Sequence, residues 1–339
     1  MNWIGLKPAL IRRPTLWLLM LGWPVFSNTP ALLGQEPRLP DQEHWHVVAR
    51  EGQRLPMGCR VIRDVDYVGK SEVRQTLDIY LPPQRDEQAV PLVVWIHGGG
   101  WRRGSKRNPP AVDQLLQRQV AVASIEYRLT DQATFPAQIH DCKAAIRFLR
   151  KNAKTLGINP ERFAAWGASA GGHLVALVGT SGDVEALEGR LGVTGVSSRV
   201  QWVCDWFGPT ELEKMNAQAG ENGQLDHDAA DSPESALLGG PVQSRIKQAR
   251  QASPLTYITP DDPPFLIMHG SADRLVPLAQ SQALHNGLRA AGVGSRLIVV
   301  PDGGHGSWGP EYRKRAVDYL VQRLRPSSEQ PPTPKSPDQ

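Results

Sequence analysis

Four short segments of the sequence combine nucleophilic, acidic, basic and glycine residues in patterns that suit acyl transfer. The most specific is the segment GASAG, in which Ser169 has only alanine and glycine around it. A nucleophilic serine on a sharp strand-to-helix turn needs small residues on both sides, because larger side chains would collide in a strained backbone. We therefore predict that Ser169 attacks a carbonyl carbon. The alternative is a serine that only caps a glycine-rich helix start.

A glycine-rich segment upstream, HGGGW, is suited to binding the negative charge that such an attack creates. Glycines allow main-chain N–H groups to approach a carbonyl oxygen closely, and a helix N-terminus also favours negative charge. We predict an oxyanion hole formed by the amides of Gly99, Gly100 and Ala170. A phosphate loop would need Gly-Lys-Ser or Gly-Lys-Thr, whereas residues 104–106 are Gly-Ser-Lys. His97 ends an apolar run and is expected to organise this loop.

An acid and a histidine late in the chain complete the set. Asp273 lies in the segment HGSADRLVP and His305 in the segment GGHG, each after an apolar run. An acid at the end of a strand can orient a downstream imidazole, which then serves as base and as acid. With Ser169 they are predicted to form a catalytic triad in the chain order Ser, Asp, His.

Other acids and histidines compete for these roles. Asp261 and Asp262 precede the apolar run and would lie at the opposite edge of a sheet. Asp302 is expected to serve a turn, and His269 to close a strand as a structural residue. The acidic stretch at 226–231 lacks the central glycine and terminal glutamate of a calcium loop, so we expect it to be solvated.

The apolar pattern predicts the elements that must position these residues. Continuous apolar runs are typical of parallel strands buried on both faces, and amphipathic helices alternate with them. Strands are predicted at 65–68, 76–80, 92–96, 120–127, 162–166, 200–207, 265–269 and 297–300. Helices are predicted at 112–118, 136–154, 172–179, 278–291 and 310–324. This alternation indicates an α/β fold with right-handed crossovers, in which helices flank a mostly parallel central sheet.

The N-terminal residues have the layout of an export signal. Lys7, Arg12 and Arg13 precede an apolar stretch over residues 15–26, and small and polar residues follow. The stretch is short for a membrane span. We predict a signal peptide over 1–34 and a secreted or periplasmic protein with no stable membrane insertion of the mature chain. The alternative is a chain anchored in the membrane by its N-terminus.

The remaining boundaries follow from composition. A polar linker is predicted over 35–56, and the main domain over 57–325. Within it the alternating pattern breaks down over 208–253, which is expected to be a small cap or lid inserted over the sheet. The proline-rich tail over 326–339 is expected to be disordered.

Charge and cysteine content exclude several classes of protein. The formal net charge is +4, and removal of the signal would leave 35 basic against 34 acidic side chains. Because nucleic-acid binders concentrate basic residues on one face, and this sequence has no basic run, no nucleic-acid partner is expected.

Cys59, Cys142 and Cys204 are too few for a disulfide framework and lack zinc spacing, so buried free thiols are expected, with one bridge as the alternative. No cofactor is expected, and the oligomeric state is not indicated.

The segments HGGGW, GASAGGH, HGSADRLVP and GGHG together resemble those of the α/β-hydrolase fold, over residues 60–325. More narrowly, the chain is similar to the bacterial esterase and lipase group that contains acetyl xylan esterases, feruloyl esterases and related carboxylesterases. Hormone-sensitive-lipase-like relatives commonly have Asp before the nucleophile, whereas Ala168 stands here, which favours the xylan and feruloyl branch. The resemblance implies the triad and oxyanion donors named above, and no metal.

The resemblance also implies a serine carboxylester hydrolase that works through an acyl-enzyme. Its substrates would be acetyl or feruloyl esters of polysaccharides, or similar small acyl esters. Trp101, beside the oxyanion loop, and Trp308, beside His305, are predicted to contact the substrate. The alternatives are an arylformamidase-like amidase and a non-catalytic binding protein of the same fold.

Overall fold

The computed structural model of the chain describes residues 36–45, 55–70, 73–83, 88–306 and 308–325. The chain divides into two units, Met1–Gly34 and Gln35–Gln339, and every described residue belongs to the second unit. The predicted signal peptide over 1–34, part of the linker over 35–56 and the tail over 326–339 lie outside the described residues.

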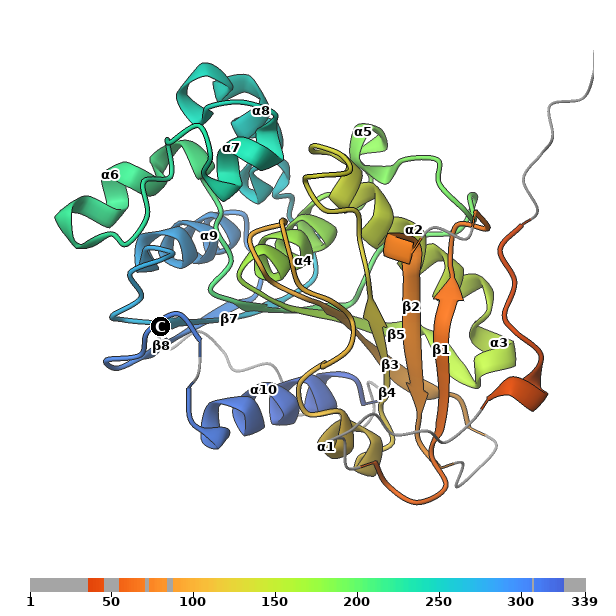
Figure 1. Cartoon of the computed structure of the whole chain (residues 1–339). Helices are drawn as coiled ribbons and strands as arrows, with labels where there is room; N and C mark the ends of the chain where they lie inside the picture. Colours follow the sequence, from red (N-terminus) through yellow and green to blue (C-terminus); the bar gives the residue numbers. More distant parts are fainter. Residues whose placement is uncertain (1–35, 46–54, 71–72, 84–87, 307, 326–339) are drawn as a thin grey trace, which may run out of the picture. The chain divides into compact units, whose positions relative to one another are not determined.

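Eight strands form one sheet in the order β1-β2-β4-β3-β5-β6-β7-β8. Figure 1 shows β1 and β2 toward one edge of this sheet and β7 and β8 toward the other. Their bounds are Arg60–Asp66 (β1), Thr76–Leu81 (β2), Val90–Ile96 (β3), Ala121–Ile125 (β4), Ile158–Ala168 (β5), Trp202–Trp206 (β6), Phe265–Gly270 (β7) and Ser295–Val300 (β8). β2 runs antiparallel to both β1 and β4, and every other neighbouring pair is parallel. The predicted α/β fold class, with a mostly parallel central sheet, is confirmed.

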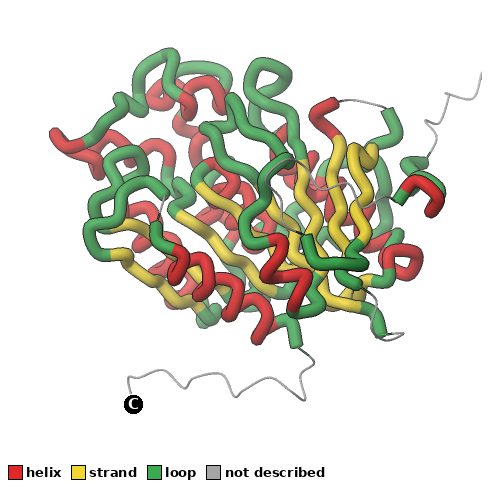
Figure 2. Tube along the Cα trace, turned by 60° about the horizontal axis from the view of Figure 1, so that its bottom comes forward, coloured by secondary structure: helices red, strands yellow, loops and turns green. Residues whose placement is uncertain are grey.

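The helices lie on both faces of the sheet (Figures 1 and 2). Their bounds are Val112–Gln117 (α1), Ala137–Lys151 (α2), Ala153–Leu156 (α3), Ala170–Thr180 (α4), Glu185–Glu188 (α5), Met215–Ala219 (α6), Pro233–Leu238 (α7), Ile246–Gln251 (α8), Leu278–Ala290 (α9) and Pro310–Arg323 (α10). Helices α2, α3, α4 and α9 pack on one face, and α1 and α10 on the other. Short 3-10 turns lie at Gln42–His44, Val73–Gln75, Leu212–Lys214, Gly220–Asn222, Val242–Ser244 and Pro254–Tyr257.

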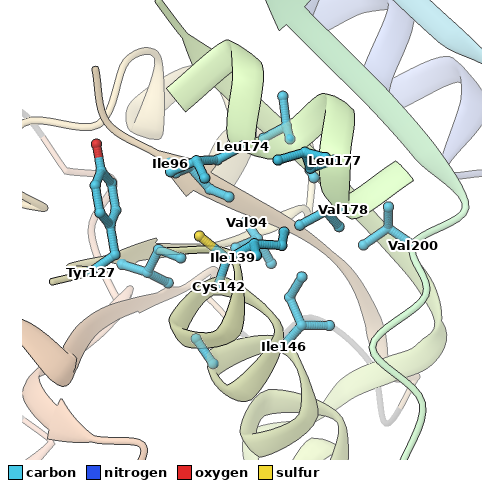
Figure 3. Packing of buried hydrophobic residues seen from close by; sticks show 14 of the residues in the cluster. Val94, Ile96, Tyr127, Ile139, Cys142, Ile146, Leu174, Leu177, Val178 and Val200 are labelled. Atoms are coloured by element: carbon cyan, nitrogen blue, oxygen red, sulfur yellow. The ribbon is translucent and has the colours of Figure 1, made fainter. Parts of the chain in front are cut away.

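Apolar side chains of the central strands point alternately into two cores. Val94 and Ile96 of β3 pack against the helices on the α4 side, where Figure 3 shows Leu174, Leu177 and Ile146 beside them. Val93 and Trp95 belong to the core on the α1 and α10 side. A strand buried on both faces must be apolar along its whole length, which is why its sequence, VPLVVWI, lacks the alternation of a half-exposed strand.

Several element ends differ from the sequence-based expectation. The helix predicted over 136–154 is two helices, because Asn152 takes a non-helical conformation and its side chain donates to the carbonyl of Phe148 at 2.9 Å. Strand β5 begins at Ile158 rather than at residue 162, since Ile158 pairs with Val90 of β3. Pairing of this kind depends on a distant strand, and the local apolar pattern does not contain it.

The insertion predicted over 208–253 contains α6, α7 and α8, which lie together beside α9 in Figure 1. Helix α7 begins with a capping bond from the Ser235 amide to the Ser232 hydroxyl, 3.0 Å, and has Pro233 in its first turn. Pro at the first helical position and Ser at the N-cap are favourable in any helix.

All three cysteines lie within the described residues, are buried and form no disulfide, as predicted. Burial raises the pKa of the Cys59, Cys142 and Cys204 thiols. Within the described part of the chain, none of the helices combines the length and apolar character that spanning a bilayer requires.

Candidate active site

Ser169 lies on the sharp turn between β5 and α4, as the segment GASAG predicted. Its backbone has φ 57° and ψ −123°, a combination that an L-residue adopts only when its surroundings enforce it. Its amide donates to the carbonyl of Trp206 on the neighbouring strand at 2.8 Å. A methyl group on Gly171 would lie 2.1 Å from the carbonyl oxygen of Ile96, so the turn tolerates no larger residue there.

The structure brings the three predicted triad residues together at the carboxyl edge of the sheet. Ser169 follows β5, Asp273 follows β7 and His305 follows β8. His305 Nε2 lies 3.0 Å from Ser169 Oγ, and His305 Nδ1 lies 2.8 Å from Asp273 Oδ2. The imidazole thus has one nitrogen on the serine hydroxyl and the other on the carboxylate, as a general base requires.

Asp273 is held by four donors. The amides of Leu275 and Val276 each donate to its Oδ1 at 2.9 Å. Its Oδ2 lies 2.8 Å from His305 Nδ1 and 3.2 Å from His269 Nε2. Burial raises the pKa of this carboxyl, but hydrogen bonds from the two histidines outweigh burial and hold the pKa well below its ordinary value. Asp273 is therefore ionised and able to stabilise a protonated imidazole.

The predicted oxyanion loop lies against the nucleophile. Strands β3 and β5 are neighbours, so the loops that follow them meet, and a methyl group on Gly98 would lie 3.2 Å from Ser169 Cβ. Gly99 and Gly100 have φ values of 115° and 60°, which favour glycine. None of the hydrogen bonds among residues 36–325, as far as these are described, uses the amides of Gly99, Gly100 or Ala170. The amide of Ala170 is adjacent to the serine in the chain, and those of Gly99 and Gly100 belong to the loop that packs against it through Gly98.

His97 organises this loop, in keeping with its expected role. Its Nδ1 lies 2.8 Å from the carbonyl oxygen of Gly98, and its ring stacks on Tyr127 with centroids 4.4 Å apart. Its Nε2 lies 3.5 Å from Glu126 Oε2. Burial raises the pKa of Glu126, but hydrogen bonding and charge from His97, with the amide of Lys106, outweigh burial and lower the pKa to about 2. The loop is therefore supported by the buried side chain of His97, which lies between the Tyr127 ring and the Glu126 carboxylate.

The two predicted substrate-contacting tryptophans differ in position. Trp101 is only 1% exposed and packs edge-on against His173 with ring centroids 5.2 Å apart. The prediction that Trp101 contacts substrate is wrong, because the turn after Gly100 directs its ring into the core. Trp308 is half-buried beside His305, and its Nε1 donates to the carbonyl of Gly304 at 3.0 Å.

Trp308 belongs to an aromatic cluster that the sequence analysis did not identify. Its ring centroid lies 5.0 Å from Phe207, 5.6 Å from Trp206 and 6.1 Å from Tyr312. Phe207 in turn lies 4.6 Å from the His305 ring. Trp206 and Phe207 end a predicted strand, and nothing near them in the sequence indicates that they contact His305 and Trp308. Those contacts depend on the path of the loop that follows β8.

Helix α7 of the insertion contacts the oxyanion loop. A methyl group on Gly100 would lie 3.2 Å from Pro233 Cβ, and Arg102 Nη1 donates to the carbonyl of Asp231 at 2.8 Å. Asp226 accepts from Asn216 at 2.6 Å, so part of the acidic stretch is used within the insertion. Among the described residues, no cluster of three or more His, Cys, Asp or Glu side chains is arranged to hold a metal ion.

His269 closes β7, as expected, but it also contacts the catalytic acid, which the sequence did not indicate. We expected a structural role for it at the end of β7, and the structure places its Nε2 against the carboxylate of Asp273. The sequence offered one signal for this contact, the spacing of four residues between His269 and Asp273. Many turns have a histidine and an acid at this spacing, so the signal is not specific.

Comparison with known proteins places these features in a family. The model of the family described as BD-FAE matches residues 77–288. The chain is 28% identical over 265 residues to Esterase LipC of Mycobacterium tuberculosis, covering 75% of this chain and 64% of that protein. It is 30% identical over 234 residues to Esterase LipQ of the same bacterium, covering 68% of this chain and 53% of LipQ. The chain therefore spans less than two thirds of the length of these relatives.

Solved structures include similar chains. A bifunctional GH43-CE protein of Bacteroides eggerthii superposes with a TM-score of 0.71 at 35% identity, covering 78% of this chain and 38% of that one. A truncated carbohydrate esterase from gut microbiota also gives a TM-score of 0.71, at 31% identity, covering 85% of this chain and 99% of that one.

Proposed function

The chain belongs to the BD-FAE family, of the α/β-hydrolase fold, and on that premise we propose that it is a serine carboxylester hydrolase. The observation that carries this proposal is the alignment of Ser169 Oγ, the His305 imidazole and the Asp273 carboxylate, with contacts of 3.0 Å and 2.8 Å. The names of the relatives, which include esterases and carboxylic ester hydrolases, support the same chemistry.

The proposed reaction begins with attack of Ser169 Oγ on the ester carbonyl carbon, while His305 Nε2 takes the hydroxyl proton. Asp273 keeps the Nδ1–H of His305 in place and stabilises the resulting positive charge. The carbonyl oxygen, now negative, accepts hydrogen bonds from the amides of Gly99, Gly100 and Ala170. Such donors stabilise the charge strongly when they are held in place before the reaction.

The intermediate then collapses, and His305 Nε2–H gives its proton to the leaving alcohol oxygen. An acyl group remains on Ser169. Water attacks this acyl carbon, with His305 again taking a proton, and the carboxylic acid leaves when the Ser169 hydroxyl is restored. Both halves of the reaction use the same three side chains and the same oxyanion hole.

We propose acetyl or feruloyl esters of polysaccharides, or similar small acyl esters, as substrates. Two of the similar solved proteins are named as carbohydrate esterase or as GH43-CE, which supports a carbohydrate-linked ester. The half-buried Trp308 beside His305 would contact the acyl group. Export of the mature chain, proposed from the N-terminal sequence, fits a polymeric substrate outside the cytoplasm.

A substrate panel tests the proposal. Acetylated xylan, methyl ferulate, p-nitrophenyl esters of graded chain length and N-formylkynurenine would be offered to the wild-type protein and to Ser169→Ala. We expect turnover of short-chain or feruloyl esters by the wild type only. Preferential turnover of N-formylkynurenine would support an amidase instead, and turnover of nothing would support a non-catalytic binding protein.

A further inference from the structure

His269, at the end of β7, makes three polar contacts although its side chain is completely buried. Its Nε2 lies 2.8 Å from the carbonyl oxygen of Val276 and 3.2 Å from Asp273 Oδ2. Its Nδ1 lies 2.7 Å from the hydroxyl oxygen of Ser281 in the first turn of α9. The proposed mechanism does not use either His269 or Ser281.

The partners of the ring fix the position of its proton. A carbonyl oxygen and a carboxylate can only accept, so Nε2 must carry the hydrogen that faces both of them. Nδ1 faces the hydroxyl of Ser281, which can either donate or accept. Ser281 therefore holds the ring in the orientation in which the Nε2–H points at Asp273.

We propose that His269 and Ser281 are positioning residues for the catalytic acid, so that the triad is the active end of a five-residue chain, Ser281–His269–Asp273–His305–Ser169. This inference rests on the proposed esterase function and deepens it. The chain runs from the buried side chain of Ser281 in the first turn of α9 to the nucleophile, and each of its four links is a contact between 2.7 and 3.2 Å.

The number of donors around Asp273 indicates a positioning role for His269. A carboxylate offers about four lone-pair sites. Two main-chain amides occupy Oδ1, and the N–H groups of His269 and His305 share Oδ2. With all four sites filled, the carboxylate cannot rotate without losing a bond. Within the described part of the chain, His269 is the one side-chain donor to Asp273 besides the catalytic base itself.

Two carboxyl groups flank His269. Asp273 lies on the loop after β7, and Asp205 lies on the neighbouring strand β6, completely buried. Burial raises the pKa of Asp205 to about 7, although the hydrogen bond from the Gly208 amide opposes that rise. The other neighbours of His269 are uncharged. Ser281 contacts it from α9, and the ring of Phe207, which follows β6, has its centroid 6.4 Å from that of the His269 ring.

The test compares His269→Leu with His269→Gln in the full chain, with p-nitrophenyl acetate as the substrate. Leucine removes the donor, whereas the glutamine Nε2 can reach the place of the imidazole Nε2. We expect His269→Leu to lower kcat roughly 10-fold to 100-fold with little change in KM. His269→Gln should recover most of that loss.

The pH profile separates positioning from simple support of the fold. With one donor fewer, the charge of Asp273 acts more fully on the protonated His305, so the acidic limb of kcat/KM should move to higher pH in His269→Leu. Ser281→Ala should shift the acidic limb in the same direction with a smaller loss of kcat. Because this variant retains the imidazole ring, it also tests the proposal if His269→Leu does not fold.

A matched control is His285→Leu, which removes another histidine–serine contact on α9, His285 Nδ1 to Ser295 Oγ at 2.9 Å. It should alter the unfolding temperature but neither kcat nor the pH limb. The inference is overturned if folded His269→Leu and Ser281→Ala keep the wild-type kcat and pH profile. If the wild type hydrolyses no ester and a fluorophosphonate does not label Ser169, the proposed function fails, and this inference with it.

Discussion

The main-chain N–H of Ser169 donates a 2.8 Å hydrogen bond to the carbonyl oxygen of Trp206. The bond ties the strained turn after β5 to the end of β6, which explains how a residue with φ 57° is held in place. It also uses the amide of Ser169 itself. The elbow therefore contributes the amide of Ala170, and not that of the nucleophile, to the proposed oxyanion hole.

Replacing the catalytic acid should abolish most turnover without disturbing substrate binding. Asp273→Asn keeps the shape of the side chain but no longer stabilises a protonated His305. We expect kcat for p-nitrophenyl acetate to fall by about 10³-fold to 10⁴-fold. Asp302→Asn is the control, since Asp302 is an exposed acid close to His305 in the chain, and it should stay near wild type. Equal losses in both variants would argue against a specific role of Asp273.

A methyl group on Gly98 should displace the oxyanion loop. It would lie 2.6 Å from the carbonyl oxygen of Ala168 and 3.2 Å from Ser169 Cβ. Gly98→Ala should therefore lower kcat by about 10²-fold or more, as expected when an oxyanion donor is lost. Gly294→Ala, where the added methyl meets only Pro264 at ordinary contact distance, should keep full activity. Steady-state kinetics of both variants decide the matter, and a fully active Gly98→Ala would remove the loop from the mechanism.

Trp308 should affect the choice of acyl group more than the chemistry itself. Trp308→Ala removes a ring beside His305, so KM for methyl ferulate should rise about 3-fold to 10-fold while kcat for p-nitrophenyl acetate changes little. Trp308→Phe keeps an aromatic face but loses the bond to Gly304, and it should retain most of the preference for the aromatic ester. If both substrates respond equally to Trp308→Ala, the ring supports the loop and does not select the substrate.

The buried carboxyl of Asp205 should make the fold less stable at neutral pH than at pH 4. Burial raises its pKa from 3.8 to about 7. Between these values the unfolded state loses the proton and the folded state keeps it, so stability falls as pH rises through this window. The loss is about 4 kcal/mol at most, from about 1.4 kcal/mol per pKa unit.

Asp205→Asn removes this titration while its side-chain oxygen can still accept from the Gly208 amide, as Asp205 Oδ1 does at 3.0 Å. The variant should gain unfolding temperature relative to wild type at pH 8 and little at pH 4. Thermal unfolding followed by circular dichroism across this range provides the measurement. A constant difference between the two proteins at all pH values would show that Asp205 does not titrate in this window.

The sequence was sufficient to predict the parts of the site that depend on local pattern. A small-residue turn, a glycine-rich loop and two late loops follow apolar runs, and parallel strands bring their carboxyl ends to one edge. That is why Ser169, Asp273 and His305 could be grouped before their distances were known.

Contacts across distant segments could not be predicted in the same way. Whether Trp101 faces the substrate or the core depends on its φ of 54° after Gly100, which its sequence neighbours do not determine. The contact between His269 and Asp273 depends on the path of the loop between β7 and α9. The pairing of Ile158 with Val90 depends on a strand about 70 residues away in the chain, so the start of β5 had no local signal.

Labelling of the nucleophile tests the central claim most directly. The folded protein would be treated with a fluorophosphonate probe and analysed by mass spectrometry of its peptides, with Ser169→Ala assayed in parallel on p-nitrophenyl acetate. We predict one adduct per chain, on Ser169, and loss of both labelling and turnover in the variant. A wild-type rate in Ser169→Ala, or an adduct on another residue that accounts for the activity, would contradict the proposed mechanism.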